Sequence, residues 1–352
     1  MSAAVQAKSL RALQLKGLPK LPESTLYHLT GPDDFLREET LTRLKSELLD
    51  PDFGDFNHRS LRCANNMKLS LLQDALAELP VMADRRLLEL HNPGGLVAKG
   101  WEAVNQTYAR AAAQGDLILI LVWDSGSGGR KAAPKKKGEA VPNDTLIDLG
   151  VKIVCDVDDK ERPQWVRNRA EQLGVNLEGG ALEALLARTG SDLRLLSSHL
   201  EKLKLYCGAG ESVPVKLVED LVPMSAEVQT WRLTAALGRR NLTEAYGVLD
   251  QLLTRGEPVG TLLSYINTYL VGMAQLKHLV VELKTPAAIA KAMPKKSEYQ
   301  IKKNLEEANS FSVEDLRNAF ERIERADFRI KTGSDPRMML QLLVLQVCRR
   351  KG

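Results

Sequence analysis

The fold is decided by residues 25–45, which read TLYHLTGPDDFLREETLTRLK. The run Thr25–Thr30 mixes apolar, aromatic and β-branched residues, which predicts a short strand. Gly31 and the three residues after it favour a turn. From Phe35 onward, leucines recur every three to four residues, the spacing of one helix face, until Pro51 ends the pattern. A strand that turns directly into a helix is typical of an α/β domain.

Strands and helices continue to alternate up to Cys155. Leu117–Trp123 is a continuous apolar run, which is typical of a strand buried on both faces of a parallel sheet. The other predicted elements are helices at Leu69–Leu79 and Val104–Ala113 and strands at Leu87–Leu90 and Val151–Cys155. The sequence therefore predicts a three-layer α/β domain over residues 21–155.

The chain after this domain is predicted to be helical. Asp192–Tyr206 carries leucines three and four residues apart, and similar patterns predict a small helical domain over residues 156–224. Asn241 and Ser312 are each followed three residues later by an acid, as at helix starts. Residues 225–352 are therefore predicted to form a third, all-helical domain.

The composition excludes several classes of protein. The 352 residues are 44% hydrophobic and carry a formal charge of +4, so the chain is neither disordered nor a general coat for nucleic acid. No apolar run approaches the roughly 20 residues of a membrane span. Residues 1–20 lack a continuous apolar stretch, so we interpret them as a loose N-terminal extension rather than a leader peptide.

Neither a catalytic site nor a metal site can be assigned. The chain has 4 cysteines and 5 histidines without metal-binding spacing: Cys63, Cys155, Cys207, Cys348, His28, His58, His91, His199 and His278. The scattered cysteines are typical of reduced thiols in the cytosol. We expect no catalytic residue, no metal ion and no cofactor.

The turn at Gly31 lies where a nucleotide-binding P-loop would lie. Aligned with GxxxxGK[ST], the sequence has Leu36 in place of the second glycine, Arg37 in place of the lysine and Glu38 in place of the hydroxyl. Two aspartates in the same turn would also repel phosphate. We therefore predict no ATP binding here. From this motif alone, an ordinary strand-to-helix turn is favoured over a degenerate P-loop.

Two basic segments could contact DNA phosphates. The glycine-containing loop at 126–139 carries Arg130, Lys131, Lys135, Lys136 and Lys137. A second cluster near Tyr299 consists of Lys291, Lys295, Lys296, Lys302 and Lys303. The loop is interpreted as a solvated linker that could touch nucleic-acid backbone, and a solvated helical face is the default for the second cluster. Asp124 is interpreted as the start of the loop rather than as a Walker B acid, because no second acid follows it.

Leu79–Met82 (LPVM) is an apolar segment between a predicted helix and a predicted strand, where polar residues usually make the connection. Such residues are either buried in the domain or offered to a partner. From the residues alone, burial is favoured.

Three segments together resemble one family: YHLTGPDDFLREETLTRLK (27–45), LPVMADRRLLEL (79–90) and LEALLARTGSDLRLLSSHLEKLKLYCG (182–208). They are similar to the delta subunit of the bacterial DNA polymerase III clamp loader, and DFRIKTG (327–333) is similar to that family's late helix and turn. The resemblance covers roughly Leu26 to Cys348, without residues 1–20 or the basic loop. It implies an AAA+-like α/β domain, a helical lid and a helical collar in a subunit that has lost ATP binding. The resemblance thus favours a degenerate P-loop at Gly31.

The resemblance also implies a role. Members of the family open the ring-shaped sliding clamp with apolar residues from the helix-to-strand connection of the first domain. By position, the clamp-binding element consists of Leu79, Pro80, Val81 and Met82. Val81 and Met82 form its wedge, and Met82 stands where relatives often have phenylalanine.

The implied partners are the clamp (the beta subunit), the gamma and tau ATPase subunits, delta prime and primed DNA, in the bacterial cytoplasm at the nucleoid. The chain would be a non-catalytic subunit of a nucleotidyltransferase holoenzyme. An active AAA+ ATPase and a nucleic-acid adaptor that uses the basic segments are the alternatives.

Overall fold

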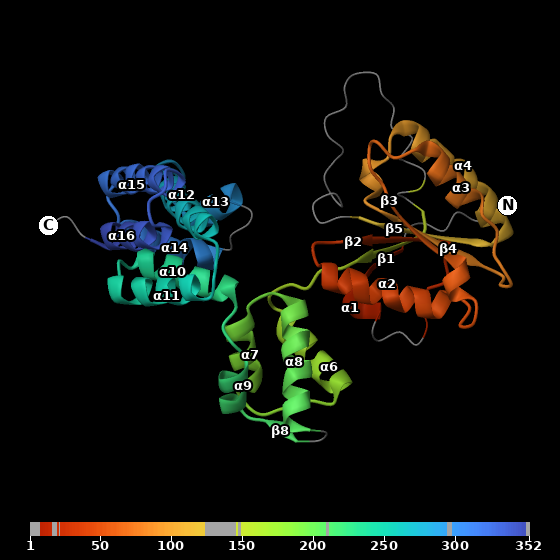
Figure 1. Cartoon of the computed structure of the whole chain (residues 1–352), viewed down its shortest axis with the longest axis horizontal. Helices are drawn as coiled ribbons and strands as arrows, with labels where there is room; N and C mark the ends of the chain where they lie inside the picture. The colour runs from red at the N-terminus through yellow and green to blue at the C-terminus, as the bar shows by residue number, and fades with distance from the viewer. Residues whose placement is uncertain are drawn as a thin grey trace. The chain divides into compact units, whose positions relative to one another are not determined.

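The chain is described by a computed structural model, whose elements are labelled in Figure 1. Its residues form two compact units. The first unit consists of Met1–Asn176 and Ser191–Ser212, and the second of Leu177–Gly190 and Val213–Gly352. The structure describes residues 8–15, 20, 22–123, 146, 149–208, 211–293 and 298–349.

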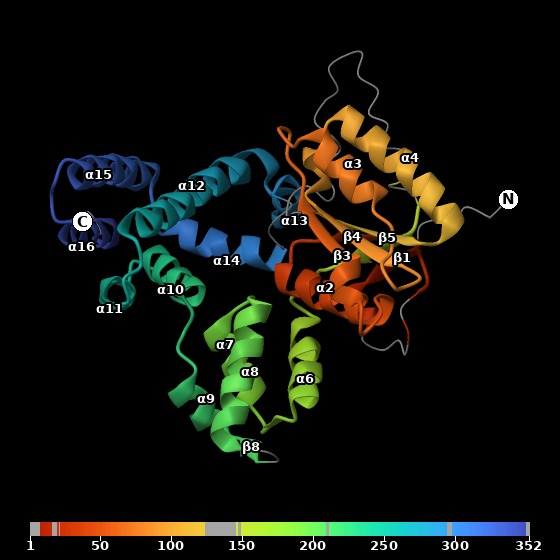
Figure 2. The same ribbon diagram turned by 45° about the vertical axis from the view of Figure 1, so that its right-hand side comes forward.

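The first unit is built on a six-stranded sheet in which all neighbouring strands are parallel. The strand order is β1-β6-β2-β5-β4-β3, with β1 (Lys8–Arg11), β2 (Leu26–Thr30), β3 (His58–Arg62), β4 (Arg86–His91), β5 (Leu117–Val122) and β6 (Val151–Val154). The helices are α1 (Ala12–Leu15), α2 (Asp34–Leu48), α3 (Leu69–Ala77), α4 (Ala98–Gln114), α6 (Arg162–Leu173) and α8 (Leu193–Cys207), with 3-10 turns η1 (Gly54–Asn57) and η2 (Pro93–Gly95). Helices α3 and α4 cover one face of the sheet and α1 and α2 the other (Figures 1 and 2). The predicted three-layer α/β architecture is confirmed.

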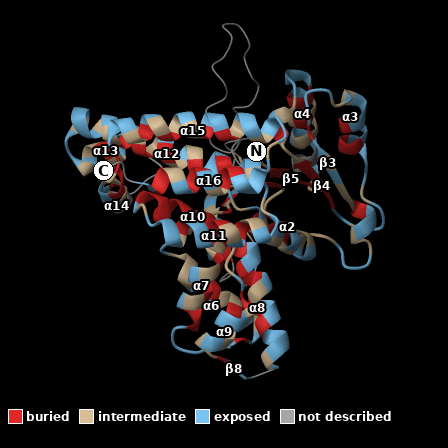
Figure 3. Cartoon of the chain, turned by 60° about the vertical axis from the view of Figure 1, so that its left-hand side comes forward, coloured by how far each residue is buried: buried red, intermediate tan, exposed pale blue. Residues whose placement is uncertain are grey.

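The centre of the sheet follows the apolar pattern. All six residues of β5 and all five of β2 are buried, as expected for strands covered on both faces. Buried leucines of β4 and β5 pack with side chains of α3 and α4, including Leu72 and Trp101. Figure 3 shows the buried residues along β4 and β5. The helix-to-strand connection between α3 and β4 therefore leads directly into a buried strand at the centre of this core.

Both edge strands, β1 and β3, were absent from the sequence-based prediction. Residues 8–15 are not a loose extension, because β1 pairs with β6 and the side chains of Ala12 and Leu15 are buried. Arg11 also donates hydrogen bonds to Glu161 and to the carbonyl of Asp156. The polar sequence of β3, HRSLR, gave no strand signal because an edge strand buries little.

Helices α6 and α8 belong to the compact α/β unit rather than to a separate body. Phe35 at the start of α2 packs edge-on against Trp165 of α6, with ring centroids 6.1 Å apart. Arg194 of α8 pairs with Glu38 of α2 at 2.8 Å. Residues 156–224 are thus shared between the two units, and their prediction as a separate helical domain stays a prediction.

The second unit is helical, with its core formed by leucines, isoleucines and valines of several helices. Its helices are α7 (Ala181–Thr189), α9 (Val215–Leu221), α10 (Ala226–Gly238), α11 (Leu242–Thr254), α12 (Val259–Leu283), α13 (Pro286–Ala292), α14 (Glu298–Asn309), α15 (Val313–Lys331) and α16 (Pro336–Cys348). Two short paired strands, β7 (Asn176–Leu177) and β8 (Ser212–Val213), contain the points at which the chain passes from the first unit to the second. Among the described residues, no helix is long and apolar enough to cross a bilayer.

The predicted helix starts of the second unit are confirmed. The Asn241 side chain accepts a hydrogen bond from the Glu244 amide, and Ser312 forms a capping box with Asp315. Asp335 caps α16, in which Pro336 is the first residue. These caps supply partners for amides that the helices cannot satisfy internally.

A buried carboxylate, Glu89, links the sheet to α2. Its Oε1 lies 2.7 Å from Lys45 Nζ and 2.6 Å from His58 Nε2, and its Oε2 lies 3.1 Å from His91 Nε2. Burial alone would raise the pKa of Glu89. The hydrogen bonds from His91 and Lys45, with the charges of Lys45 and His58, outweigh burial and lower its pKa to about 2.

The Glu89 pKa predicts a stability that depends on pH. Because the folded pKa lies below the ordinary glutamate value of 4.5, ionised Glu89 stabilises the fold above about pH 4.5, and this is lost as the pH falls towards 2. We expect Glu89→Gln to lower the free energy of unfolding by on the order of 3 kcal/mol at pH 7 and by much less at pH 2.5, as measured by urea unfolding. The exposed Glu38→Gln should change stability by less than about 1 kcal/mol. An equal loss for Glu89→Gln at both pH values would contradict this.

Candidate functional site

The LPVM segment, Leu79–Met82, lies between the end of α3 and the start of β4. Leu79 is 72% exposed, Val81 51% and Met82 76%, while Pro80 is partly buried. Burial, which the residues alone favoured, is therefore wrong. Adjacent apolar side chains exposed to solvent are typical of surfaces that bind a partner.

Contacts of main-chain atoms hold the LPVM segment in place. The Val81 amide donates to Asn57 Oδ1 at 2.7 Å, and Asn57 Nδ2 donates to the Val81 carbonyl at 2.8 Å. At the end of α3, the buried Arg86 guanidinium donates to the carbonyls of Ala75 and Leu76, both at 2.8 Å. The segment is thus anchored on both sides while its apolar side chains remain exposed.

Phe56, which the sequence analysis did not single out, is a further exposed apolar residue in this region. It is 75% exposed and lies in η1, directly before Asn57. The sequence feature that could have identified Phe56 is a pair of phenylalanines, Phe53 and Phe56, inside DPDFGDFN, a stretch rich in turn-forming residues. A large apolar residue in such a turn is unusual unless something covers it.

The Gly31 turn has a structural reason for its glycine. Gly31 has φ +113°, and a Cβ built on it would lie 2.2 Å from the carbonyl oxygen of Cys155. The Asp33 amide donates to the same carbonyl at 3.2 Å, so the turn is pressed against the residue after β6. Glycine is required here for close backbone packing.

The residues that replace the P-loop side chains fill the start of α2. The Asp33 carboxylate accepts from the Leu36 amide at 2.8 Å, which places a negative charge where a phosphate would bind. Arg37 is buried and donates to the Gly31 carbonyl. Leu36 is buried in the core, and Glu38 is exposed in its pair with Arg194.

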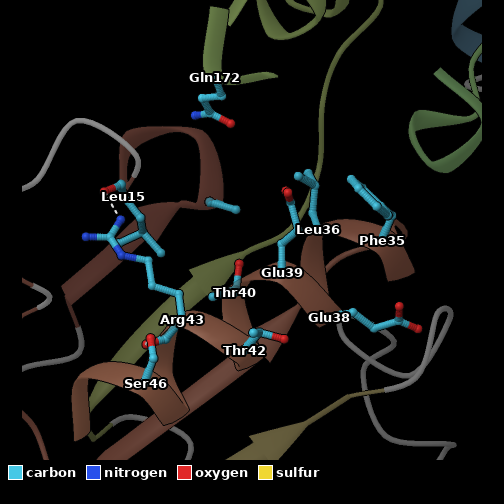
Figure 4. A pocket seen from close by; sticks show the side chains of 11 residues that line it. Leu15, Phe35, Leu36, Glu38, Glu39, Thr40, Thr42, Arg43, Ser46 and Gln172 are labelled. Carbon is cyan, nitrogen blue, oxygen red and sulfur yellow. Dashed lines mark hydrogen bonds between the residues drawn. The ribbon is translucent and has the colours of Figure 1, made fainter. Parts of the chain in front are cut away.

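A cavity of about 560 Å³ lies beside α2 (Figure 4). Glu38 and Glu39 line it, and its Arg43 donates to the Leu15 carbonyl and pairs with Glu47. Its acids disfavour phosphate, and none of the predicted site residues except Leu36 and Glu38 lines it. We assign no ligand to this cavity.

A second depression lies in the helical unit, between α11 and α16. Its volume is about 450 Å³ and its lining consists of Leu242, Thr243, Tyr246, Met338, Gln341, Leu342 and Leu345. All five of its large apolar side chains are exposed. We call this surface the α11/α16 groove.

The described residues offer little for covalent or metal chemistry. They contain no group of three metal-binding side chains. Burial raises the pKa of the Cys63 thiol to about 11 and that of the Cys155 thiol to about 12, so neither is a thiolate at neutral pH. The His28 ring contacts the carbonyls of Leu146 and Leu149, as a satisfied core histidine does.

The basic segments are only partly described. Arg130, Lys131, Lys135, Lys136, Lys137 and Asp124 lie outside the described residues, as do Lys295 and Lys296. Lys291 in α13 and Lys302 in α14 are exposed. A DNA-contacting role for either segment stays a prediction.

Two family models match the chain. The model of the DNA polymerase III delta subunit, C-terminal domain, matches residues 227–347. A second model, described as a middle domain, matches residues 158–220. The two matches fall within the predicted third and second domains.

Two relatives with the name of this subunit match a larger part of the chain than either family model does. The DNA polymerase III subunit delta of Bacillus subtilis (strain 168) is 24% identical over 346 residues, which are 95% of this chain and 96% of the relative. A protein named "Probable DNA polymerase III subunit delta" from Aquifex aeolicus (strain VF5) is 25% identical over 195 residues, 55% of this chain and 56% of the relative.

A solved structure agrees with the fold. The Bacillus subtilis DNA clamp loader delta protein superposes with a TM-score of 0.63 at 22% identity and covers 93% of this chain and 96% of its own. The likeness extends over both the parallel α/β sheet and the helical unit. Residues 227–347 therefore match the C-terminal domain of DNA polymerase III delta subunits, and the chain as a whole is similar in sequence and in fold to the delta subunit of the bacterial clamp loader.

Proposed function

We propose that this chain binds the ring-shaped sliding clamp through the LPVM segment and holds one interface of the ring open. The observation that carries the proposal is the exposure of Leu79, Val81 and Met82 on a segment whose main chain is hydrogen-bonded to Asn57, the residue directly before β3. Exposed apolar side chains on a fixed main chain can enter a pocket with little loss of backbone entropy. Because most binding energy in an interface comes from a few such anchors, a short segment is sufficient.

The direct test uses the purified chain and the sliding clamp of the same cell. Titration of the clamp should show saturable binding, and fluorophores placed across one clamp interface should report its separation. Absence of both signals would contradict the proposal.

The work of the chain in this proposal is conformational. It would join the gamma and tau ATPase subunits and delta prime in the cytoplasm. Nucleotide bound to the ATPases would expose the LPVM segment, and hydrolysis triggered by primed DNA would release the ring. The α11/α16 groove supports assembly through the helical collar, because its exposed leucines and tyrosine have the composition of an interface core.

We predict that the chain does not bind ATP at the Gly31 turn. The Asp33 carboxylate already occupies the start of α2, and Arg37 is used by the Gly31 carbonyl. Calorimetric titration with Mg·ATP should therefore give no saturable heat, whereas a purified loader ATPase should bind in the same assay. Micromolar binding that Arg37→Ala weakens would support the alternative, an active AAA+ ATPase.

The loop with Arg130, Lys131, Lys135, Lys136 and Lys137 should affect DNA binding only through charge. Five cations can neutralise a few phosphates but read no bases. In the assembled loader, replacing all five by glutamine should reduce the slope of log affinity against log salt by about 0.9 for each phosphate that is no longer neutralised. An unchanged slope would show that the loop is only a linker. If the isolated chain bound DNA without any clamp, and this DNA affinity fell steeply with salt, the alternative of a nucleic-acid adaptor would be supported.

A further inference from the structure

The side chain of Asn57 has an unusual set of partners for a residue in a surface turn. It is only 4% exposed, and both polar atoms of its amide contact the main chain of Val81, at 2.7 Å and 2.8 Å. Its Nδ2 also donates to the Phe53 carbonyl at 2.9 Å. One amide side chain thus bonds Val81 as a neighbouring β-strand residue would, by both its N–H and its C=O.

The LPVM segment depends on this side chain. Among the described residues, no other hydrogen bond joins the main chain of residues 79–82 to the rest of the protein. Met82, which follows Val81, has φ +53°, a left-handed conformation that a side chain other than glycine rarely adopts. Such a conformation persists only where the surroundings hold it. The bonds from Asn57 to Val81 are the restraint adjacent to it.

The same turn presents Phe56. The Phe56 amide donates to the Phe53 carbonyl at 3.2 Å, the same carbonyl that Asn57 binds. The exposed Phe56 is therefore tied to the LPVM segment through its neighbour Asn57. Beyond η1, Arg59 of β3 pairs with Glu78 at the end of α3, which adds a second link between the two segments.

We infer that the turn Phe53–Asn57 is the second half of the clamp-binding surface: Asn57 is a positioning residue that presents Val81 and Met82, and Phe56 is a further apolar contact to the same clamp. The inference rests on the proposed function. A segment already held in its bound conformation loses less entropy on binding, so the loss of Asn57 should weaken the clamp complex although Asn57 itself does not touch the clamp.

The test compares Asn57→Ala, Phe56→Ala and the double variant Val81→Ala/Met82→Ala with the wild-type chain in clamp titrations. Asn168→Ala, which truncates a partly buried asparagine of α6 that accepts a hydrogen bond from Gln164, is the control. We expect Asn57→Ala to weaken clamp binding at least 10-fold and Phe56→Ala at least 5-fold, with the control unchanged. Hydrogen exchange of the free Asn57→Ala chain should be faster at residues 79–84 but unchanged in β4 and β5.

A purely structural role for Asn57 would not give this exchange pattern, nor coupling to Met82. If Asn57 acts by presenting Met82, its replacement should weaken binding less in a Met82→Ala chain than in the wild type. If Asn57→Ala does not fold, the clamp affinity of Phe56→Ala tests whether the turn belongs to the clamp-binding surface, because Phe56 is exposed and its truncation should leave the fold intact.

The possible failures are distinguishable. If Val81→Ala/Met82→Ala binds the clamp as the wild type does, the proposed function is wrong. If that double variant loses binding while Asn57→Ala or Phe56→Ala keeps wild-type affinity, the proposed function stands and the two-part surface is overturned.

Discussion

Replacing Val81 and Met82 together by alanine is expected to abolish tight clamp binding while leaving the fold intact. The two side chains are 51% and 76% exposed, so their truncation removes little buried area and should change the free energy of unfolding by less than about 1 kcal/mol. As interface anchors, each should contribute about 2 kcal/mol or more to the complex. The pair then corresponds to a loss of about 1,000-fold in affinity. Urea unfolding and clamp titration of the same preparation measure both quantities.

The chain offers a matched control for this variant. Val97 is 51% exposed, as Val81 is. Val81 precedes β4 in the chain, whereas Val97 lies after β4, directly before α4. Val97→Ala should bind the clamp with wild-type affinity. A large loss of stability in Val81→Ala/Met82→Ala, with affinity per folded molecule unchanged, would instead place these residues in the core of the unit.

The second large effect is expected at the α11/α16 groove. Leu342 lies in this groove and is exposed in the free chain, so Leu342→Glu should leave the helical unit folded. If the groove is covered by partner subunits, the new carboxylate would be buried without a counter-charge. That costs roughly 3 kcal/mol or more, which is above 100-fold in affinity. We therefore expect the variant to fail to co-purify with the loader ATPases.

Val281→Glu provides the comparison for the groove variant. Val281 lies in α12 of the same unit and is 76% exposed, but it does not line the groove. It should assemble normally, as judged by size-exclusion chromatography of the reconstituted loader. Stoichiometric assembly of Leu342→Glu would move the interface to another face of the helical unit.

The sequence was sufficient to predict strands that are buried along their whole length and helices that begin with a capping residue. The run in β5, LILILV, is apolar throughout because both faces of that strand are covered, and the capped helix starts carry their partners three residues away. The edge strands could not be found in this way. β3 is half exposed, and β1 exists only because β6, about 140 residues later, offers an edge to pair with.

The candidate site was harder to predict because it depends on contacts distant in sequence. Nothing within LPVM distinguishes an exposed segment from a buried one, since the Asn57 side chain that holds it lies 24 residues earlier. The resemblance to clamp-loader delta subunits, rather than any local pattern, was the reason to select this segment as a candidate site. Conversely, Gly31 had a plausible chemical explanation in sequence, as part of a degenerate P-loop, while its steric reason, the carbonyl of Cys155, is visible only in the fold.

The pairing of β1 with β6 has a practical consequence for protein production. A chain shortened to begin after residue 20 would leave the outer edge of β6 with unpaired amides and carbonyls. Open strand edges promote edge-to-edge aggregation. Such a chain should express in a less soluble form than the full chain, and a purification tag is better placed away from the residues of β1.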